Sequence, residues 1–513
     1  MSSGDEKSLR VLEAEVPVNH DKESSEVLAT VEILANGSDS LTPQTWLEKI
    51  THFLTRWGVE TNGVDPIPAE DRTDPKLFQI FFVWFSANMN VLALGTGAAG
   101  PAFFGMGVKQ SLLILLIVDL ISCAVPAYFA VFGPKLGTRS MVTARFSWGY
   151  YGAIIPSALT VFSMQGFLIL NCIVGGQMLA SVSPHLNDTL GIVIIGVISF
   201  CVTFCGYKVI HLYESVAWIP NVIAFIVMLG LGGKHLTNAP PPAPLTAASI
   251  ITFATTTSSS VISWCMMTPD YGVYHNSRAS SMRVFIYTYL GFFTASLTAH
   301  YLGAIFAACA GNVPSWEAGF DNGNNVGGLI RAVLHRAGGF GDFLTVILAL
   351  SIPSACAPTM YTFGTSLMTI GTWFNRIPRY VFMVVSMAIL IPVAIVGATH
   401  FYDTFVDILS IIGYWSAVFA VIVILEHVIF RHNNWSYYDV SDWNQPSKLP
   451  VGIAATMSFL CAVGIIVPCM SQAWYTGPIA KMGTGDLGIL TGSVVALITY
   501  PPFRWLEKRL TGR

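Results

Sequence analysis

Apolar residues gather into twelve long runs after Lys76, and polar residues mark the connections between the runs. Each run is long enough to cross about 30 Å of hydrocarbon as an α-helix. The pattern predicts spans at about 78–100, 108–132, 150–181, 189–206, 212–232, 247–274, 284–311, 342–372, 379–398, 401–430, 450–472 and 484–503. The predicted fold class is therefore all-α, a polytopic membrane protein with 12 transmembrane helices.

The composition supports a membrane protein and excludes several other classes. Of the 513 residues, 53% are hydrophobic and 11% are charged, against about 25% charged in an ordinary soluble domain. The net charge of −3 gives no basis for a nucleic-acid partner. All nine cysteines fall within apolar runs, which is typical of small buried residues and not of a disulfide framework. A soluble enzyme, a secreted disulfide domain and a nucleic-acid binder are excluded.

The chain divides into three parts by composition. Residues 1–75 are expected to form a cytoplasmic N-terminal tail that is mostly disordered. Within this tail, residues 46–57 have helical apolar spacing, and they either lie on the membrane face or, as we favour, pack on the cytoplasmic side of the protein. Residues 76–430 are predicted to form a ten-helix transport core. Residues 431–513 then hold helices 11 and 12 and a cytoplasmic C-terminus.

The distribution of lysine and arginine predicts the orientation in the membrane. With the N-terminus inside, the inside loops and the C-terminus hold 14 of these residues, and the outside loops hold 5. This bias places both termini in the cytoplasm. Asn187, which is followed by Asp188 and Thr189, then lies outside as a possible N-glycosylation acceptor.

The first and sixth spans contain unusual segments at corresponding places in the two halves. Residues 95–101 read GTGAAGP, and residues 255–260 read TTTSSS, followed by Pro269 and Asp270. Such a matched pair indicates a transporter with inverted repeats and a binding site near the membrane midplane. We therefore predict a five-plus-five inverted repeat with broken helices 1 and 6. The alternative is that glycines and small hydroxyl residues only allow close helix packing.

Few ionisable residues lie deep in a span, and Asp119 is the plainest case. An acid in mid-membrane is by default a functional hypothesis, here a proton-coupling group. The alternative is that Asp119 is a hydrogen-bonded packing residue. Sodium coupling through Ser351 and Ser354 is also open, although such hydroxyls more often bond backward to helix carbonyls.

Sequence motifs of catalysis are absent. The chain has no HExxH, no CxxC pair, no GxSxG and no phosphate-binding GxxxxGK[ST], and its histidines show no metal-ligand spacing. We therefore expect no enzymatic activity, no cofactor and no metal, and a transport step driven by a gradient. A membrane-embedded enzyme would need a cluster of His or acidic ligands at membrane depth.

Several segments together resemble the fungal purine-cytosine permeases of nucleobase-cation symporter family 1. They are residues 60–68 (ETNGVDPIP), 70–75 (EDRTDP), 137–146 (GTRSMVTARF), 171–177 (NCIVGGQ), 217–221 (AWIPN) and 270–274 (DYGVY). The resemblance runs from about residue 55 to the C-terminus. It implies twelve helices, ten of them in an inverted repeat, and proton symport of nucleobases or related heterocycles across the plasma membrane.

The resemblance also implies a set of substrate-binding positions. Family members stack the heterocycle between an aromatic residue on helix 3 and a tryptophan on helix 6, which are Phe167 and Trp264 here. Asn171 matches the amide that hydrogen-bonds the base. The remaining implied positions are Ala93 and Gly95 on helix 1, and Ala355, Cys356 and Thr359 on helix 8.

Helix 8 departs from the family pattern, because its residues 355–362 read ACAPTMYT where the family has three asparagines. Paired amide bonds reject analogues most sharply, so their loss predicts a more apolar pocket with altered specificity. The expected function is a secondary active symporter that imports a purine- or cytosine-type nucleobase, or a related small heterocycle, with protons. The alternatives are a pyridoxine-type vitamin or other metabolite carrier, and a non-transporting receptor. The expected partners are this heterocycle, the coupling proton and the lipid bilayer.

Overall fold

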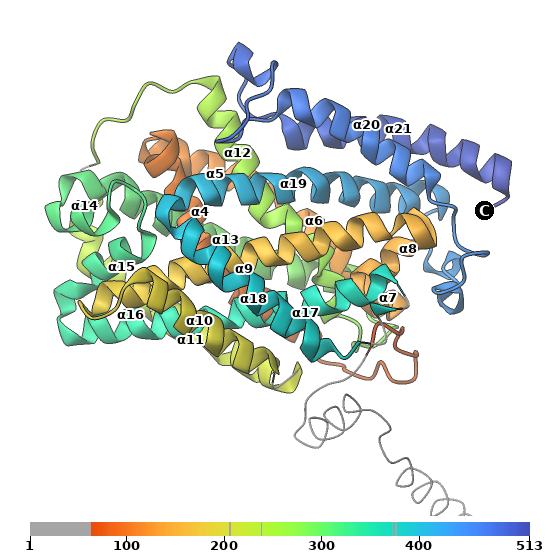
Figure 1. The fold of residues 1–513 in the computed structure, drawn as a ribbon, viewed down its shortest axis with the longest axis horizontal. Coiled ribbons are helices and arrows are strands. Elements are labelled where there is room, and N and C mark those ends of the chain that lie inside the picture. The colour runs from red at the N-terminus through yellow and green to blue at the C-terminus, as the bar shows by residue number, and fades with distance from the viewer. Residues whose placement is uncertain (1–62, 205–206, 238, 372, 375–376) are drawn as a thin grey trace, which may run out of the picture. The chain divides into compact units, whose positions relative to one another are not determined.

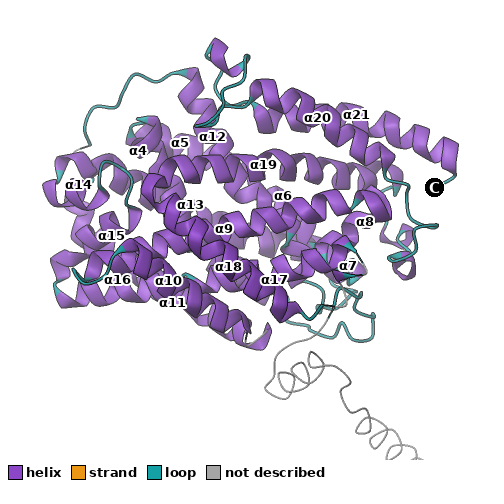
Figure 2. Cartoon of the chain, viewed as in Figure 1, coloured by secondary structure: helices purple, strands orange, loops and turns teal. Residues whose placement is uncertain are grey.

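The computed structural model describes residues 63–513, except 205–206, 238, 372 and 375–376. The predicted helix at 46–57 and the rest of the tail to residue 62 lie outside the described residues. Within the described part, the named elements are helices, and strand pairing is limited to two isolated bridges (Figures 1 and 2).

The α-helices are α3 (Gln79–Asn88), α4 (Val91–Phe104), α5 (Val108–Ser122), α6 (Ala124–Ala130), α7 (Phe132–Leu136), α8 (Ser140–Gly152), α9 (Ile154–Val182), α10 (Asp188–Phe204), α11 (Tyr207–Gly232), α12 (Ala247–Ile262), α13 (Ser281–Cys309), α14 (Pro314–Phe320), α15 (Val326–Leu334), α16 (Gly339–Ser351), α17 (Pro353–Ile370), α18 (Arg379–Gly397), α19 (Phe401–Leu425), α20 (Ile453–Cys469) and α21 (Gly488–Thr511). Short 3₁₀ segments include η2 (Ser263–Met266) and η3 (Thr268–Tyr271), and a π-turn, η8 (Glu426–Phe430), follows α19.

Each of the twelve predicted spans contains helix in the structure. Six helical stretches in the described part are by themselves long and apolar enough to cross a membrane. They are Val108–Leu136, Ile154–Val182, Val216–His235, Ser281–Asn312, Gly339–Ile370 and Tyr380–Phe430. α3 and α4 meet the same test together, although they are bent by 50° at their junction. The prediction of an all-α polytopic membrane protein is confirmed.

Helix packing follows the symmetry of two five-helix units. α4 of the first span packs on α13 of the seventh, and the equivalent pair, α12 of the sixth span and α5 of the second, is also in contact. The third and eighth spans, α9 and α17, pack on each other, as do α10 and α18 of the fourth and ninth. Exchanging the two units turns the first of these contacts into the second and maps each of the other two onto itself, as an inverted repeat requires.

The last two helices, α20 and α21, pack on each other, and both contact α19 (Figure 1). A buried charge cluster fixes this contact. The Arg504 guanidinium lies 3.0 Å from a Glu426 carboxylate oxygen, and the Tyr500 hydroxyl donates to the same oxygen at 2.9 Å. Pairing of this kind keeps a buried carboxylate from being left unsatisfied.

The first span is broken, but not at the glycine-rich segment where the sequence suggested a break. The break lies at Met89 and Asn90, and residues 95–101 are inside α4. Met89 caps the end of the first helix, and Asn90 begins the second, because its side chain accepts a hydrogen bond from the Ala93 N–H as an N-cap. The glycines serve close packing instead: a Cβ on Gly97 would lie 1.9 Å from the His300 carbonyl oxygen on α13.

The break in the sixth span also lies beyond its hydroxyl-rich segment. Residues 255–260 belong to α12, which continues to Ile262. The chain then passes through η2, a non-helical Met267 (φ −135°, ψ −14°) and η3, which contains Pro269 and Asp270. Ser259 and Ser263 hydroxyls bond backward to carbonyls four residues earlier, as hydroxyls commonly do within helices.

Residues 63–75, at the end of the predicted tail, contact the helical core. Val64 is 1% exposed, the Ile67 N–H donates to the Gly137 carbonyl, and Arg72 donates to the Pro134 carbonyl at 2.9 Å. Asp74 exchanges backbone hydrogen bonds with Tyr274 and Asn276, just after η3. The tail boundary at residue 75 stays a prediction.

Candidate functional site

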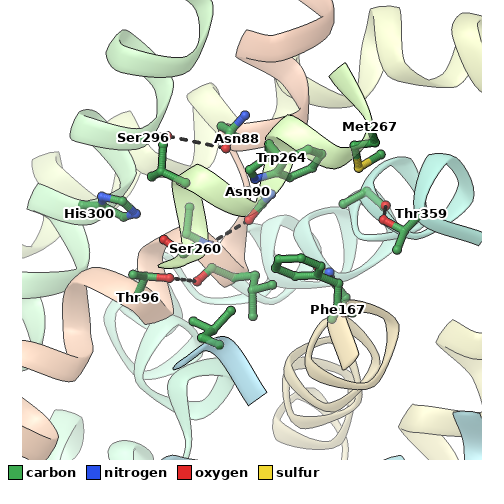
Figure 3. Close-up of a pocket in the computed structure, with 16 residues that line it drawn as sticks. Asn88, Asn90, Thr96, Phe167, Ser260, Trp264, Met267, Ser296, His300 and Thr359 are labelled. Carbon is green, nitrogen blue, oxygen red and sulfur yellow. Dashed lines mark hydrogen bonds between the residues drawn. The ribbon is translucent and has the colours of Figure 1, made fainter. Parts of the chain in front are cut away.

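A cavity lies where the two broken spans face α9, α13 and α17 (Figure 3). Its walls are formed by Asn88, Asn90, Leu92, Ala93, Thr96, Phe167, Asn171, Ser260, Val261, Trp264, Met267, Ser296, His300, Ala355, Thr359 and Leu409. The space open to the centre of a water-sized molecule is about 40 Å³, which is enough for a few waters. Non-helical backbone at membrane depth is tolerated where it lines such a cavity.

Two aromatic rings from different halves of the chain bound the cavity. The rings of Phe167 on α9 and Trp264 in η2 have centroids 6.2 Å apart and planes inclined by 31°. Trp84 and Phe292 hold the indole in place through edge contacts at 5.8 and 5.9 Å. A flat ring between two others needs about 7–8 Å between their planes, twice the carbon contact distance. The two rings lie closer than this, so they would have to separate to take a planar molecule between them.

Asn171 presents an acceptor without a partner in this cavity. Its Nδ2 donates to the Phe167 carbonyl one turn earlier at 2.9 Å, whereas its buried Oδ1 has no hydrogen-bond partner. The wall also holds Asn88, whose Nδ2 donates to the Trp84 carbonyl at 3.0 Å and whose Oδ1 accepts from Ser296 at 3.5 Å. Asn171 Oδ1 is thus the amide oxygen left for a bound molecule.

Three hydroxyl groups in the wall also direct their protons away from the cavity. Thr96, Ser260 and Thr359 each donate to a carbonyl three or four residues earlier in the same helix, at 3.2, 2.8 and 2.7 Å. Their oxygen lone pairs remain as acceptors. With Asn171, the lining offers more hydrogen-bond acceptors than donors, which suits a molecule carrying N–H groups.

A buried ionisable pair reaches the cavity from the side of α13. Nδ1 of His300 lies 2.9 Å from Oδ2 of Asp119 on α5, and the two side chains are 2% and 0% exposed. His300 lines the cavity (Figure 3), whereas the second oxygen of Asp119 has no partner. The pair therefore connects a buried acid to the wall of the site.

The structure gathers six of the predicted binding residues around the cavity: Ala93, Phe167, Asn171, Trp264, Ala355 and Thr359. Gly95 and Cys356 are not among the lining residues. The Gly95 carbonyl accepts a hydrogen bond from Tyr402 at 3.3 Å, and the thiol of the fully buried Cys356 contacts that of Cys172 on α9. Both lie on helix faces that pack against protein.

Sequence reasoning missed His300, Asn90, Ser260 and Ser296 as lining residues. A histidine inside an apolar run is itself an intramembrane ionisable residue, and that signal marks His300. Ser260 belongs to the hydroxyl-rich segment 255–260 that marked the sixth span as unusual. Asn90 and Ser296 carried no comparable signal, because their place in the wall depends on where the helices break and cross. Asn187 is exposed and its Oδ1 caps the start of α10, and its glycosylation stays a prediction.

The fold and its cavity between two broken helices define a membrane transporter built from inverted repeats. The solved structure of Mhp1, a nucleobase-cation-symport-1 family transporter in a closed conformation with bromovinylhydantoin bound, has a TM-score of 0.68 at 16% identity. It covers 88% of this chain and 96% of that one. The inward-facing conformation of Mhp1 has a TM-score of 0.66 at 17% identity, with the same coverage. These similarities show the fold.

Sequence comparison identifies the family. Residues 66–492 match the family described as permease for cytosine/purines, uracil, thiamine, allantoin. The purine-cytosine permease fcyB of Emericella nidulans is 33% identical over 91% of this chain and 92% of that protein. The purine-cytosine permease FCY2 of Saccharomyces cerevisiae is 32% identical over 93% of this chain and 91% of that protein. The vitamin B6 transporter TPN1 of Saccharomyces cerevisiae is 27% identical over 91% of this chain and 90% of that protein. The chain belongs to this permease family, within nucleobase-cation symporter family 1, and is a transporter rather than an enzyme.

Proposed function

We propose that this protein is a secondary active symporter that imports a purine- or cytosine-type nucleobase, or a closely related small heterocycle. The observation that carries the proposal is the cavity between Phe167 and Trp264, whose aromatic faces suit a planar ring. The surplus of acceptors in its wall suits the ring N–H and amino groups of such bases. The purine-cytosine permeases among the relatives support the same substrate class.

A pyridoxine-type vitamin is the second candidate substrate. Ala355 and Thr359 stand on α17 where the family pattern has amides. Ala355, Leu92 and Met267 contribute apolar surface to the cavity wall. A wall of this kind does not read a base edge by paired hydrogen bonds. The relative that transports vitamin B6 supports this candidate.

We further propose that the coupling ion is a proton and that Asp119 and His300 carry it together. With one shared proton the buried pair has no net charge, and without it the pair has one uncompensated negative charge. A buried uncompensated charge is costly, so a buried acid and histidine in contact are suited to carry a coupling proton between them. Cys123, Tyr289 and Tyr301 are further ionisable groups near Asp119.

The proposed location is the plasma membrane with both termini in the cytoplasm. The lysine and arginine bias supports this orientation. It places the junction of α9 and α10 outside the cell, where Asn187 would be open to glycosylation. Residues 1–75 would then form the cytoplasmic tail, residues 76–430 the transport core, and residues 431–513 the last two helices and a cytoplasmic end.

The test is competition uptake in cells that lack their own nucleobase carriers. Labelled adenine, cytosine and pyridoxine are each offered to cells expressing the protein, with unlabelled purines, pyrimidines and pyridines as competitors. The proposal predicts accumulation of a purine or cytosine, faster at acidic external pH. Accumulation of pyridoxine alone would select the second candidate. Binding without accumulation would indicate a receptor and contradict the proposal.

A further inference from the structure

A second, larger cavity lies beside the helix ends that the charge bias assigns to the outside. Its volume is about 250 Å³, and its walls include Phe103, Phe104, Thr252, Asp403, Asp407 and Gln472. These residues come from the end of α4, the start of α12, the start of α19 and the segment after α20. The site already described accounts for none of them.

The same three helices, α4, α12 and α19, contribute to both cavities. On α4, Thr96 lines the central cavity and Phe103 lines the outer one. On α12, the corresponding residues are Ser260 and Thr252. Separations of seven and eight residues correspond to about 11–12 Å along a helix. The outer cavity therefore lies about two helical turns from the central site, on the side from which an imported molecule arrives.

The polar groups of the outer cavity are dominated by acceptors. Asp403 is exposed and Asp407 is half-buried, and they lie one turn apart on α19. One oxygen of Asp407 accepts from the Ala473 N–H at 2.9 Å. No lysine, arginine or histidine is among the residues of its wall. The cavity thus carries negative charge without a basic side chain in its lining.

Gln472 adds an acceptor that has no partner. The residue is 5% exposed, and its Nε2 donates to the Asp486 carboxylate at 3.0 Å, which fixes the direction of the amide. Its Oε1 is buried and has no hydrogen-bond partner. Because buried polar groups normally have a hydrogen-bond partner, an unpaired acceptor in a cavity wall indicates a bound molecule that donates to it. Phe103, 43% exposed, and Phe104 provide aromatic surface in the same wall.

We propose that the outer cavity is a second binding site, which takes an amino-substituted planar heterocycle before it passes to the central site. A carboxylate accepts two parallel N–H bonds, and the ring N–H and amino group of a protonated aminopyrimidine or aminopurine supply them. The phenyl rings contact its face. The inference rests on the proposed function, because it takes the imported molecule to be a nitrogen heterocycle of this class.

The test is equilibrium binding of labelled cytosine and adenine to the purified full-length protein in detergent. We expect two sites in the wild type. Trp264→Ala should remove the central site and leave one. Asp403→Asn should weaken the outer site at least tenfold and leave the central affinity unchanged, and the double variant should retain only the weakened outer site. Asp403 is exposed, so this substitution leaves the packing intact. Glu317→Gln on α14, outside both linings, is the matched control and should retain two sites.

Several results would overturn the inference. A single site in the wild type that Trp264→Ala alone abolishes would leave nothing for the outer cavity to bind. A second contrary result would be that millimolar sodium or calcium displaces the outer ligand and that cytosine and uracil bind there with equal affinity. This result would assign the cavity to an inorganic cation. Absence of base binding by the wild type would contradict the proposed function as well, and this result differs from one-site binding.

Discussion

His300 and Asp119 are hydrogen-bonded at 2.9 Å although 181 residues separate them, and His300 belongs to the wall of the central cavity. The bond joins α13 to α5, which are the seventh and second spans. These two spans are equivalent under the inverted repeat. A group that both binds a proton and faces the site can link protonation to substrate binding without a longer pathway.

Asp119→Asn is predicted to uncouple transport from the proton gradient. The amide cannot complete the neutral, proton-sharing pair with His300, so concentrative uptake should be lost and its dependence on external pH abolished. Exchange of labelled for unlabelled base should continue, because the rest of the site remains. Uptake and exchange are measured between external pH 5 and 8. Asp342→Asn is the control, since that carboxylate is part-exposed and pairs with Arg331. Wild-type accumulation by Asp119→Asn would place Asp119 in packing.

Gly97→Ala is predicted to disrupt the contact between α4 and α13. The added Cβ would lie 1.9 Å from the His300 carbonyl oxygen, a backbone atom that cannot turn away. Overpacking of this kind costs about 1–3 kcal/mol, which thermal unfolding of the purified protein measures as a lowered midpoint. Gly464→Ala on α20 is the control, because nothing lies within 4 Å of its added Cβ. Equal thermal unfolding midpoints for the two variants would contradict the close contact between α4 and α13.

Asn171→Ala is predicted to raise the apparent substrate constant at least tenfold. The variant removes the acceptor Oδ1 that has no protein partner, so a donor on the bound substrate would lose its partner. A buried donor without a partner costs roughly 1–3 kcal/mol, and about 1.4 kcal/mol corresponds to a tenfold change in affinity. Initial uptake rates give KM and the maximal rate, and surface expression is measured in parallel. Cys172→Ala, its buried neighbour outside the lining, should leave KM unchanged. An unchanged KM in Asn171→Ala would assign Asn171 to helix packing.

Ala355→Asn combined with Thr359→Asn is predicted to broaden recognition toward purines and cytosine. Both positions line the cavity, so the new amides can bond a base edge by paired donors and acceptors. We expect stronger inhibition of uptake by those bases and weaker binding of an apolar competitor. Cys356→Asn serves as a contrast: its side chain is fully buried against Cys172, so it should lower stability without changing specificity. Unchanged inhibition by those bases in the double variant would show that amides at these two positions do not contribute to base recognition.

The spans and the aromatic pair were predictable from the sequence, but the geometry of the breaks was not. Twelve apolar runs are a one-dimensional signal, and the lysine and arginine bias orders them. The break at Asn90 depends on a side-chain cap, and the glycines at 95–101 looked like a break because close packing requires the same residues. The Asp119–His300 bond joins distant spans, and no local pattern reports such a contact.

The central claim is that a planar heterocycle binds against Trp264, and a substitution series at this residue tests it most directly. Initial uptake of labelled adenine and cytosine is compared among wild type, Trp264→Phe and Trp264→Ala, with surface protein quantified in each. Aromatic stacking is worth about 1–3 kcal/mol per base. We predict that phenylalanine retains partial uptake with a raised KM, and that alanine abolishes uptake while the protein stays at the surface. Normal uptake by Trp264→Ala at low substrate concentration would contradict the account.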